Sequence, residues 1–372
     1  MWKYLLDENE NEEIEMKKNG CRYLAFVDYL GTERLYRNAD LQLDAIVDRR
    51  QELEHAIQIL LQPFIAAKEI EIGVFSDTVL IAGPSLPRVL HCSSLLMKFV
   101  LEKTINRANR IDCRLLRGGL AKGVELRTTY LRPGPRVHVV PFFDSSLAFS
   151  YELGGVRKGS RLFLSDTVGD EDLGNLKEFV FKWQYLSGVG SPAVGIHEFL
   201  WPGYVYKEEP AALASLVERA FAQWREYVRD FPGTREDYKA TLYHFDETIK
   251  CMLRSLIPLR DFPYGVEAIK RCAHVILPRE ADYMEDCDIR YIWGFWFQAL
   301  LVLCTSKLVA EHDSAILLTK KELVRRGYLD NFMAESNYPD YKALKELFQS
   351  DLWRANRGTD ESEVPPGFTP QL

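Results

Sequence analysis

The sequence predicts an α+β fold in its N-terminal half, followed by a mainly helical region. Strand-like and helix-like segments alternate from about residue 20 to residue 166, and strand signals largely vanish past about residue 206. The chain has 372 residues, of which 47% are hydrophobic and 27% are charged. This length and composition can form the core of one large domain or of two.

The elements of the N-terminal half follow from the spacing of their apolar residues. The run YLAFV, which ends at Asp28, is typical of a buried strand, and the three- to four-residue spacing over 41–65 predicts a helix. Two β-rich runs, 70–75 and 78–82, flank Ser76-Asp77 and predict a hairpin. The later segments are predicted as a helix at 87–109, strands at 113–121 and 137–140, a helix at 144–153 and a strand at 161–164. The order β-α-β-β-α-β that begins this series is ferredoxin-like, with helices on one face of a mainly antiparallel sheet.

Two consecutive glycines, Gly118 and Gly119, interrupt the predicted strand at 113–121. Glycine inside a strand indicates either a β-bulge or a close approach of another group to the backbone. His138 and His197 lie in strand-like runs, and we expect both to have structural roles.

Helical patterns dominate the second half of the chain, at 211–229, 235–256, 264–276 and 291–304. The last of these, YIWGFWFQALLVLC, is shorter than the roughly 20 residues that span a bilayer, and it contains Gln298. We therefore expect a buried helix, in a core or in a dimer interface, and no membrane association. The predicted organisation is an N-terminal segment at 1–19, an α+β domain at 20–205, a helical region at 206–356 and a polar, proline-rich, loose tail at 357–372.

Composition argues against several classes of partner and location. The net charge is −7, so the basic surface typical of nucleic-acid binding is absent. The seven cysteines are dispersed without a C-x-x-C pair, as in reduced, cytoplasmic proteins. The N-terminal 20 residues have an acidic centre and no apolar stretch, which is unlike a signal peptide. We therefore expect a cytoplasmic protein without nucleic-acid partners.

Two acids occupy the same setting in the predicted sheet. Asp28 follows a strand in FVDYLG, and Asp77 lies at the tip of the hairpin in VFSDTV. In a βαββ unit the first strand and the hairpin commonly lie side by side, so the two carboxylates would be close and would repel each other. Mg²⁺ or Mn²⁺ relieves such repulsion and prefers carboxylate, carbonyl and phosphate oxygens. Gly31 leaves room for phosphate oxygens near the chain.

The two aspartates therefore predict a two-metal site of the kind that serves in-line displacement at phosphorus. The alternative interpretation is that each aspartate begins a turn, where aspartate is favoured. The occurrence of both, followed by the Arg-Gly-Gly strand, favours the metal site.

The succession FVDYLG, a helix, FSDTVLIAG and LLRGGLAKG resembles the class III nucleotidyl cyclase core, over roughly residues 20–166. The segment FFDSSLAFSYELGGVRKGSRLFLSD is similar to the pyrimidine cyclases of bacterial antiphage defence, the Pycsar family. This resemblance implies that Asp28 and Asp77 bind two Mn²⁺ or Mg²⁺ ions and that Tyr29 adds a backbone carbonyl ligand. It also implies a homodimer that converts a ribonucleoside triphosphate to a 3′,5′-cyclic monophosphate, which switches on a separate effector. The implied product is cyclic UMP, made from UTP, or alternatively cyclic CMP.

Three positions depart from the pattern of adenylyl and guanylyl cyclases. Gly73 stands where those enzymes have a base-reading lysine, and Ala148 and Glu152 stand where they have an asparagine and an arginine.

Charge on the α-phosphate needs a donor, which makes Arg117, Arg157 and Arg161 the candidates. Two other functions stay open: a catalytically degenerate cyclase fold that senses or scaffolds, and a metal-dependent phosphohydrolase.

Overall fold

The computed structural model describes residues 16–30, 39–75, 77–106, 114–128, 159–184, 195–230, 236–278 and 289–325. Contacts divide the chain into two compact units, Met1–Ala268 and Ile269–Leu372. The sheet and the helices up to Ala268 belong to the first unit, whereas the sequence predicts a helical region from residue 206.

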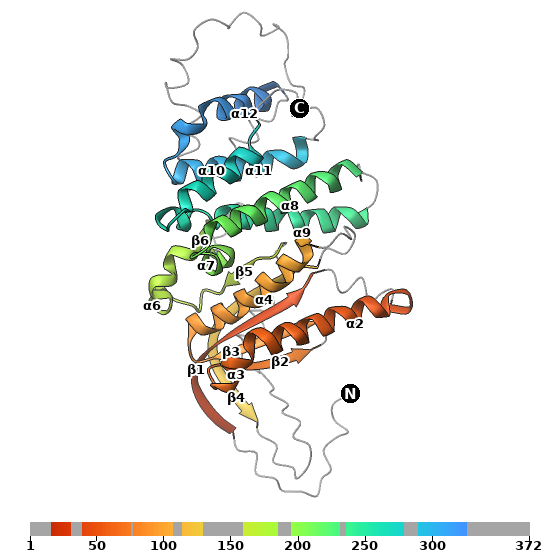
Figure 1. Cartoon of the computed structure of the whole chain (residues 1–372). Coiled ribbons are helices and arrows are strands. Elements are labelled where there is room, and N and C mark those ends of the chain that lie inside the picture. The colour runs from red at the N-terminus through yellow and green to blue at the C-terminus, as the bar shows by residue number, and fades with distance from the viewer. Residues whose placement is uncertain are drawn as a thin grey trace, which may run out of the picture. The chain divides into compact units, whose positions relative to one another are not determined.

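The first unit contains a sheet whose seven described strands have the order β2-β3-β1-β4-β5-β7-β6 (Figure 1). The strands are β1 Met16–Tyr29, β2 Glu71–Phe75, β3 Thr78–Gly83, β4 Leu116–Thr128, β5 Leu162–Leu164, β6 Val180–Gln184 and β7 Gly195–Phe199. Neighbouring strands are antiparallel, except that β4 and β5 are parallel. The predicted α+β class, the order βαββαβ and the mainly antiparallel sheet are confirmed.

The helices of the first unit connect and cover these strands. They are α2 Ala39–Ala56, the π-helical turn η1 Ile57–Leu61, α3 Gln62–Ala66, α4 Leu86–Asn106, α6 Asp170–Leu173, the 3₁₀ helix η2 Gly174–Phe179, α7 Trp201–Val205, α8 Pro210–Asp230, α9 Glu236–Arg254 and the 3₁₀ helix η3 Pro258–Asp261. Helix α10, Gly265–Ile276, crosses the division between the units. The predicted helices at 41–65, 87–109, 211–229, 235–256 and 264–276 are confirmed.

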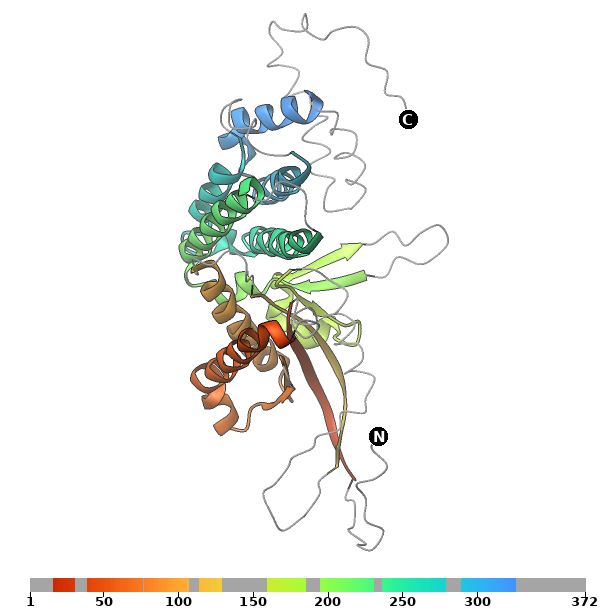
Figure 2. The ribbon, with the colours of Figure 1, turned by 90° about the vertical axis from the view of Figure 1, so that its right-hand side faces the viewer.

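Helix α4 forms the core of this unit together with the sheet. Its apolar residues recur at three- to four-residue spacing, and Leu90, Met97 and Leu101 are among its buried side chains. The helix packs on β1, β3 and β4, and α2 lies on the same face of the sheet (Figure 2). Complete burial of one such side chain stabilises the fold by about 1.5–3 kcal/mol.

Gly118 in β4 is a point of close approach and not a bulge. A Cβ atom there would lie 2.9 Å from the carbonyl oxygen of Phe26 and 2.9 Å from Cδ1 of Leu162. The irregularity in the pairing of β1 with β4 lies elsewhere, between Lys18 and Cys21. Of the two readings of the glycine pair, close approach is therefore confirmed at Gly118.

The second unit contains α11 Ile289–Thr305, the 3₁₀ helix η5 Val309–His312 and α12 Asp313–Arg325. Phe295, Trp296 and Leu300 of α11 are buried within the chain, as predicted for this apolar segment. No helix in the described part of the chain is both long and apolar enough to cross a membrane.

Some predicted segments lie outside the described residues: the N-terminal segment up to residue 15, the strand at 137–140, the helix at 144–153 and the tail at 357–372. The strand-like run around His197 is confirmed as β7, whereas β6 was not predicted. Strand β6 has only five residues, VFKWQ, and lies at the edge of the sheet beside β7. A run this short does not show a period that distinguishes a strand from a loop.

Candidate active site

The sheet brings the two predicted aspartates together. Strand β1 lies between β3 and β4, and Asp28, near its end, is opposite Thr78 of β3 and Arg117 of β4. Asp77 directly precedes Thr78, at the turn of the β2-β3 hairpin. The backbone N–H of Tyr29 donates to the carbonyl oxygen of Asp77 over 3.4 Å. The β1 end and the hairpin tip are thus adjacent, as the βαββ pattern predicts.

Two donors hold the carboxylate of Asp28. The hydroxyl of Thr78 donates to Oδ1 over 2.9 Å, and Nη2 of Arg117 lies 3.4 Å from Oδ2. The side chain of Asp28 is 15% exposed and that of Arg117 is 23% exposed. Arg117 is therefore at the site, with part of its side chain exposed.

Burial is the largest cause that raises the pKa of Asp28, the negative charge of Asp77 raises it as well, and the pKa reaches about 6. The hydrogen bonds from Thr78 and Arg117 and the positive charge of Arg117 lower this pKa, but they do not offset burial and the second acid. The site therefore combines a mostly buried carboxyl group with a second acid nearby, which is a condition that a bound cation relieves.

The donor set at this place fits a divalent ion that also binds a substrate. Among the described residues, no group of three or more His, Cys, Asp and Glu side chains is arranged to hold a metal. Mg²⁺, however, is commonly bound by one or two carboxylates together with substrate phosphates and water. Asp28 and Asp77 supply two carboxylates, and the effect of Asp77 on the Asp28 pKa shows that their charges interact.

Tyr29 contributes to this region through its backbone. Its ring is buried, and the guanidinium carbon of Arg49 lies 5.5 Å from the ring centroid. Gly73 lies in β2, opposite Leu80 of β3. Gly31, Ala148, Glu152 and Arg157 lie outside the described residues.

The arginine candidates differ in their surroundings. Arg161 is buried, and its Nε and Nη2 donate to the two carboxylate oxygens of Glu198 over 2.7 and 2.8 Å. Its Nη1 donates to Glu247 over 3.1 Å. All three guanidinium nitrogens are thus engaged inside the protein, so Arg161 is excluded as a donor to a bound phosphate. Arg117 is the described candidate that lies beside Asp28.

Sequence reasoning missed two features of this region. Thr78 was quoted in the motif FSDTV without a role, although a hydroxyl next to an acidic residue at a strand start is a ready hydrogen-bond donor. The partners of Arg161 were also missed, because Glu198 and Glu247 are 37 and 86 residues away in the sequence.

No family model matches this sequence, and no curated protein matches it. Solved structures of cyclase domains are similar to half of the chain at low identity. The adenylate/guanylate cyclase/hydrolase from Silicibacter pomeroyi is 14% identical over 50% of this chain and 98% of its own, with a TM-score of 0.36. The adenylyl cyclase CyaB from P. aeruginosa is 11% identical over 50% of this chain and 96% of its own, with a TM-score of 0.35.

A third similar structure is the guanylyl cyclase domain of the RhoGC fusion protein from the aquatic fungus Blastocladiella emersonii, described as a non-canonical dimer. It is 9% identical over 50% of this chain and 97% of its own, with a TM-score of 0.36. At such scores and identities, the likeness carries no conclusion about what this chain binds or does.

Proposed function

We propose that this chain is a nucleotidyl cyclase with its active site at the β1 end and the tip of the β2-β3 hairpin. In the proposed reaction the 3′-hydroxyl of a bound ribonucleoside triphosphate attacks its own α-phosphate in line. A bond forms between O3′ and the α-phosphorus, the bond to the leaving pyrophosphate breaks, and the proton of the 3′-hydroxyl is released to solvent. The observation that supports this proposal most is the meeting of Asp28, Asp77 and Arg117 at one place in the sheet.

The proposed role of each residue in this reaction is based on its position in the site. Asp28 and Asp77 would hold Mn²⁺ or Mg²⁺, two ions in the proposed form, with Tyr29 adding its carbonyl oxygen. Such ions, when bound, neutralise charge on the triphosphate and stabilise the displacement. Thr78 fixes the orientation of the Asp28 carboxylate through its 2.9 Å hydrogen bond. Arg117 would donate to the α-phosphate as negative charge develops there.

The proposed substrate is a pyrimidine nucleoside triphosphate, UTP in preference to CTP. Gly73 supports the choice of a pyrimidine over a purine, because glycine offers no side-chain donor at the position where the resemblance places a purine-reading lysine. The segment similar to the Pycsar cyclases supports the further proposal that cyclic UMP serves as a messenger in phage defence. In that role it acts on a separate effector, and the enzyme is a cytoplasmic homodimer.

The test is incubation of the purified protein with each of ATP, GTP, CTP and UTP and Mn²⁺, with separation of products by mass. Asp28→Asn and Asp77→Asn are the site variants. Asp170→Asn is the matched control, because its side chain is 57% exposed at the start of α6. We expect one cyclic pyrimidine monophosphate from the wild type and from Asp170→Asn, and none from the site variants.

Other results would each remove a part of the proposal. A cyclic purine product would overturn the pyrimidine choice, and full activity of Asp77→Asn would overturn the site. Absence of any cyclic product, with phage lysate added, would overturn the cyclase. Nucleotide binding without turnover would then favour the sensing or scaffold function, and free phosphate from simple esters would favour the phosphohydrolase.

A further inference from the structure

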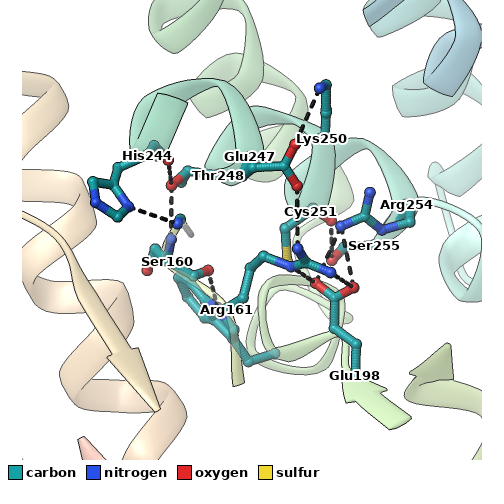
Figure 3. Close-up of polar contacts among 12 residues, drawn as sticks. Ser160, Arg161, Glu198, His244, Glu247, Thr248, Lys250, Cys251, Arg254 and Ser255 are labelled. Carbon is teal, nitrogen blue, oxygen red and sulfur yellow. Dashed lines mark hydrogen bonds and ion pairs between the residues drawn. The ribbon is translucent and has the colours of Figure 1, made fainter. Parts of the chain in front are cut away.

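A buried ionic cluster joins helix α9 to strands β5 and β7 (Figure 3). Glu198 of β7 accepts hydrogen bonds from Arg161 at the start of β5, over 2.7 and 2.8 Å, and from Nη2 of Arg254 of α9, over 3.1 Å. The side chains of Glu198 and Arg254 are 0% exposed. A buried ion pair can often be replaced by apolar side chains without loss of stability. We therefore expect this cluster to contribute a defined geometry.

The same helix also binds the backbone that leads into β5. The N–H of Gly159 donates to Nδ1 of His244 over 3.1 Å, and the N–H of Ser160 donates to the hydroxyl of Thr248 over 2.8 Å. Gly159 has a φ of +87°, and a Cβ atom there would lie 2.7 Å from Cβ of Glu247. Residues 159–161 are therefore held against α9 by backbone, side-chain and steric contacts.

One backbone hydrogen bond connects residues 159–161 to β4, the strand that carries Arg117. The N–H of Gly118 in β4 donates to the carbonyl oxygen of Arg161 over 2.9 Å. Gly118 directly follows Arg117, whose guanidinium lies 3.4 Å from the carboxylate of Asp28. The close approach of Gly118 to Leu162 leaves β4 little freedom to shift relative to β5.

We propose that α9 is a positioning element for the candidate active site. His244 and Thr248 bind the backbone of Gly159 and Ser160, and Arg254 holds Glu198, which accepts from Arg161. Through the hydrogen bond between Gly118 and Arg161, this contact determines where β4 presents Arg117 beside Asp28. The proposal rests on the proposed cyclase function for its effect on catalysis. The three α9 residues act through Gly159, Ser160 and Glu198, so the proposal makes them positioning residues and not catalytic ones.

The sharpest test compares two buried threonines. The hydroxyls of Thr248 and Thr319 each donate to the carbonyl oxygen four residues earlier in their helices, over 2.7 and 2.8 Å. Thr248 also accepts from Ser160. Thr248→Val therefore leaves the N–H of Ser160 without this acceptor, whereas Thr319→Val in α12 is the matched control. Thr248→Ser keeps the acceptor and serves as the rescue variant.

Two readouts separate positioning from general stability. The first is amide hydrogen exchange of peptides that contain Gly118, compared with peptides from β3 in the same protein. The second is the pair kcat and KM for cyclic product formation. In Thr248→Val we expect faster exchange around Gly118 and a fall in kcat on the order of tenfold with KM little changed, because a small misplacement of a catalytic group is costly. Thr319→Val and Thr248→Ser should behave like the wild type.

Equal exchange around Gly118 in Thr248→Val and Thr319→Val would overturn the proposal. Faster exchange with unchanged kcat would also overturn it, since α9 would then stabilise the fold without positioning the site. An inactive wild type would overturn the proposed function instead, and the exchange comparison would still decide whether α9 fixes β4. If Thr248→Val does not fold, Arg254→Lys, which keeps the charge but not the guanidinium, is measured in the same way.

Discussion

The carboxyl group of Asp28 is mostly buried and lies near a second acid. Its two donors, Thr78 and Arg117, lower its pKa but leave it raised to about 6. An apo site of this kind keeps electrostatic repulsion that a cation removes, so metal binding and the stability of the fold are linked. Metal binding can therefore be measured as a change in the stability of the fold, without enzymatic turnover.

We predict that Mn²⁺ raises the Tm of the wild type and has little effect on Asp28→Asn or Asp77→Asn. An ion that binds only the folded chain adds about 2.7 kcal/mol to the free energy of unfolding at 100 times its Kd. Thermal unfolding with and without Mn²⁺ measures the effect, and Asp170→Asn is the control. An equal rise of Tm in Asp77→Asn would contradict a shared site.

Glu198 is the shared partner in the buried cluster, because it accepts hydrogen bonds from two buried arginines. We predict that Glu198→Ala lowers the free energy of unfolding by about 3–5 kcal/mol, since removal of one partner leaves buried charge uncompensated. Glu54→Ala is the control, because Glu54 forms an exposed pair with Arg50 within α2 and should change stability by about 0.5 kcal/mol or less. Urea unfolding measures both variants, and similar losses would contradict the assignment.

At the scale of the element, α9 carries a group of acidic and basic side chains close to one another. Asp246, Glu247 and Lys250 form one group, with Nζ of Lys250 2.7 Å from Asp246 and 3.1 Å from Glu247. Burial raises the pKa of Asp246 to about 6, and the charge of Lys250, which acts in the opposite direction, does not offset it.

We predict that α9 makes the fold less stable as the pH rises from about 4 to 6. The pKa of Asp246 is raised from 3.8 in the unfolded chain to about 6 in the folded one, so the folded chain holds the proton more tightly. The stabilisation is complete below the unfolded value and is lost as pH rises through the folded value, by at most about 1.4 kcal/mol per pH unit. Asp246→Asn should lack the share of this loss that Asp246 contributes, while the share of Asp28 remains.

Urea unfolding of the wild type and of Asp246→Asn from pH 4 to pH 8 measures the difference. Asp261→Asn, with a 78% exposed side chain, is the control and should follow the wild type at each pH. A constant difference between Asp246→Asn and the wild type across this range would contradict the prediction.

At the scale of the whole molecule, β1 and β4 extend beyond the other strands in the described part of the sheet. The pairing of β1 with β3 ends at Tyr23, whereas its pairing with β4 continues to Met16 (Figure 2). A two-stranded ribbon is only marginally stable by itself in water. Contact with a second copy of the chain would stabilise such a ribbon, which agrees with the proposed homodimer.

We therefore predict a molar mass in solution of about twice the chain mass of 43.0 kDa. Light scattering coupled to size-exclusion chromatography measures it, over a dilution series that reveals dissociation. A mass of one chain at every concentration would contradict the homodimer, while the cyclase reaction would stay a separate question.

The sequence determined the class of the fold and the two acids of the candidate site. Both depend on local patterns: apolar spacing identifies the strands and helices, and Asp28 and Asp77 each lie close after an apolar run. The same local reasoning missed β6, which is short and ends the sheet. It also kept Arg161 among the phosphate donors, because nothing adjacent in the sequence reveals its partners.

Only the tertiary structure decided between Arg117 and Arg161. Strand register places Arg117 opposite Asp28, and chain folding brings Glu198 and Glu247 around Arg161. The two arginines thus have different surroundings, one partly exposed beside Asp28 and one buried between two glutamates. The physical reason is that burial and charge partners depend on contacts between residues distant in the sequence, which periodicity and motif spacing do not encode.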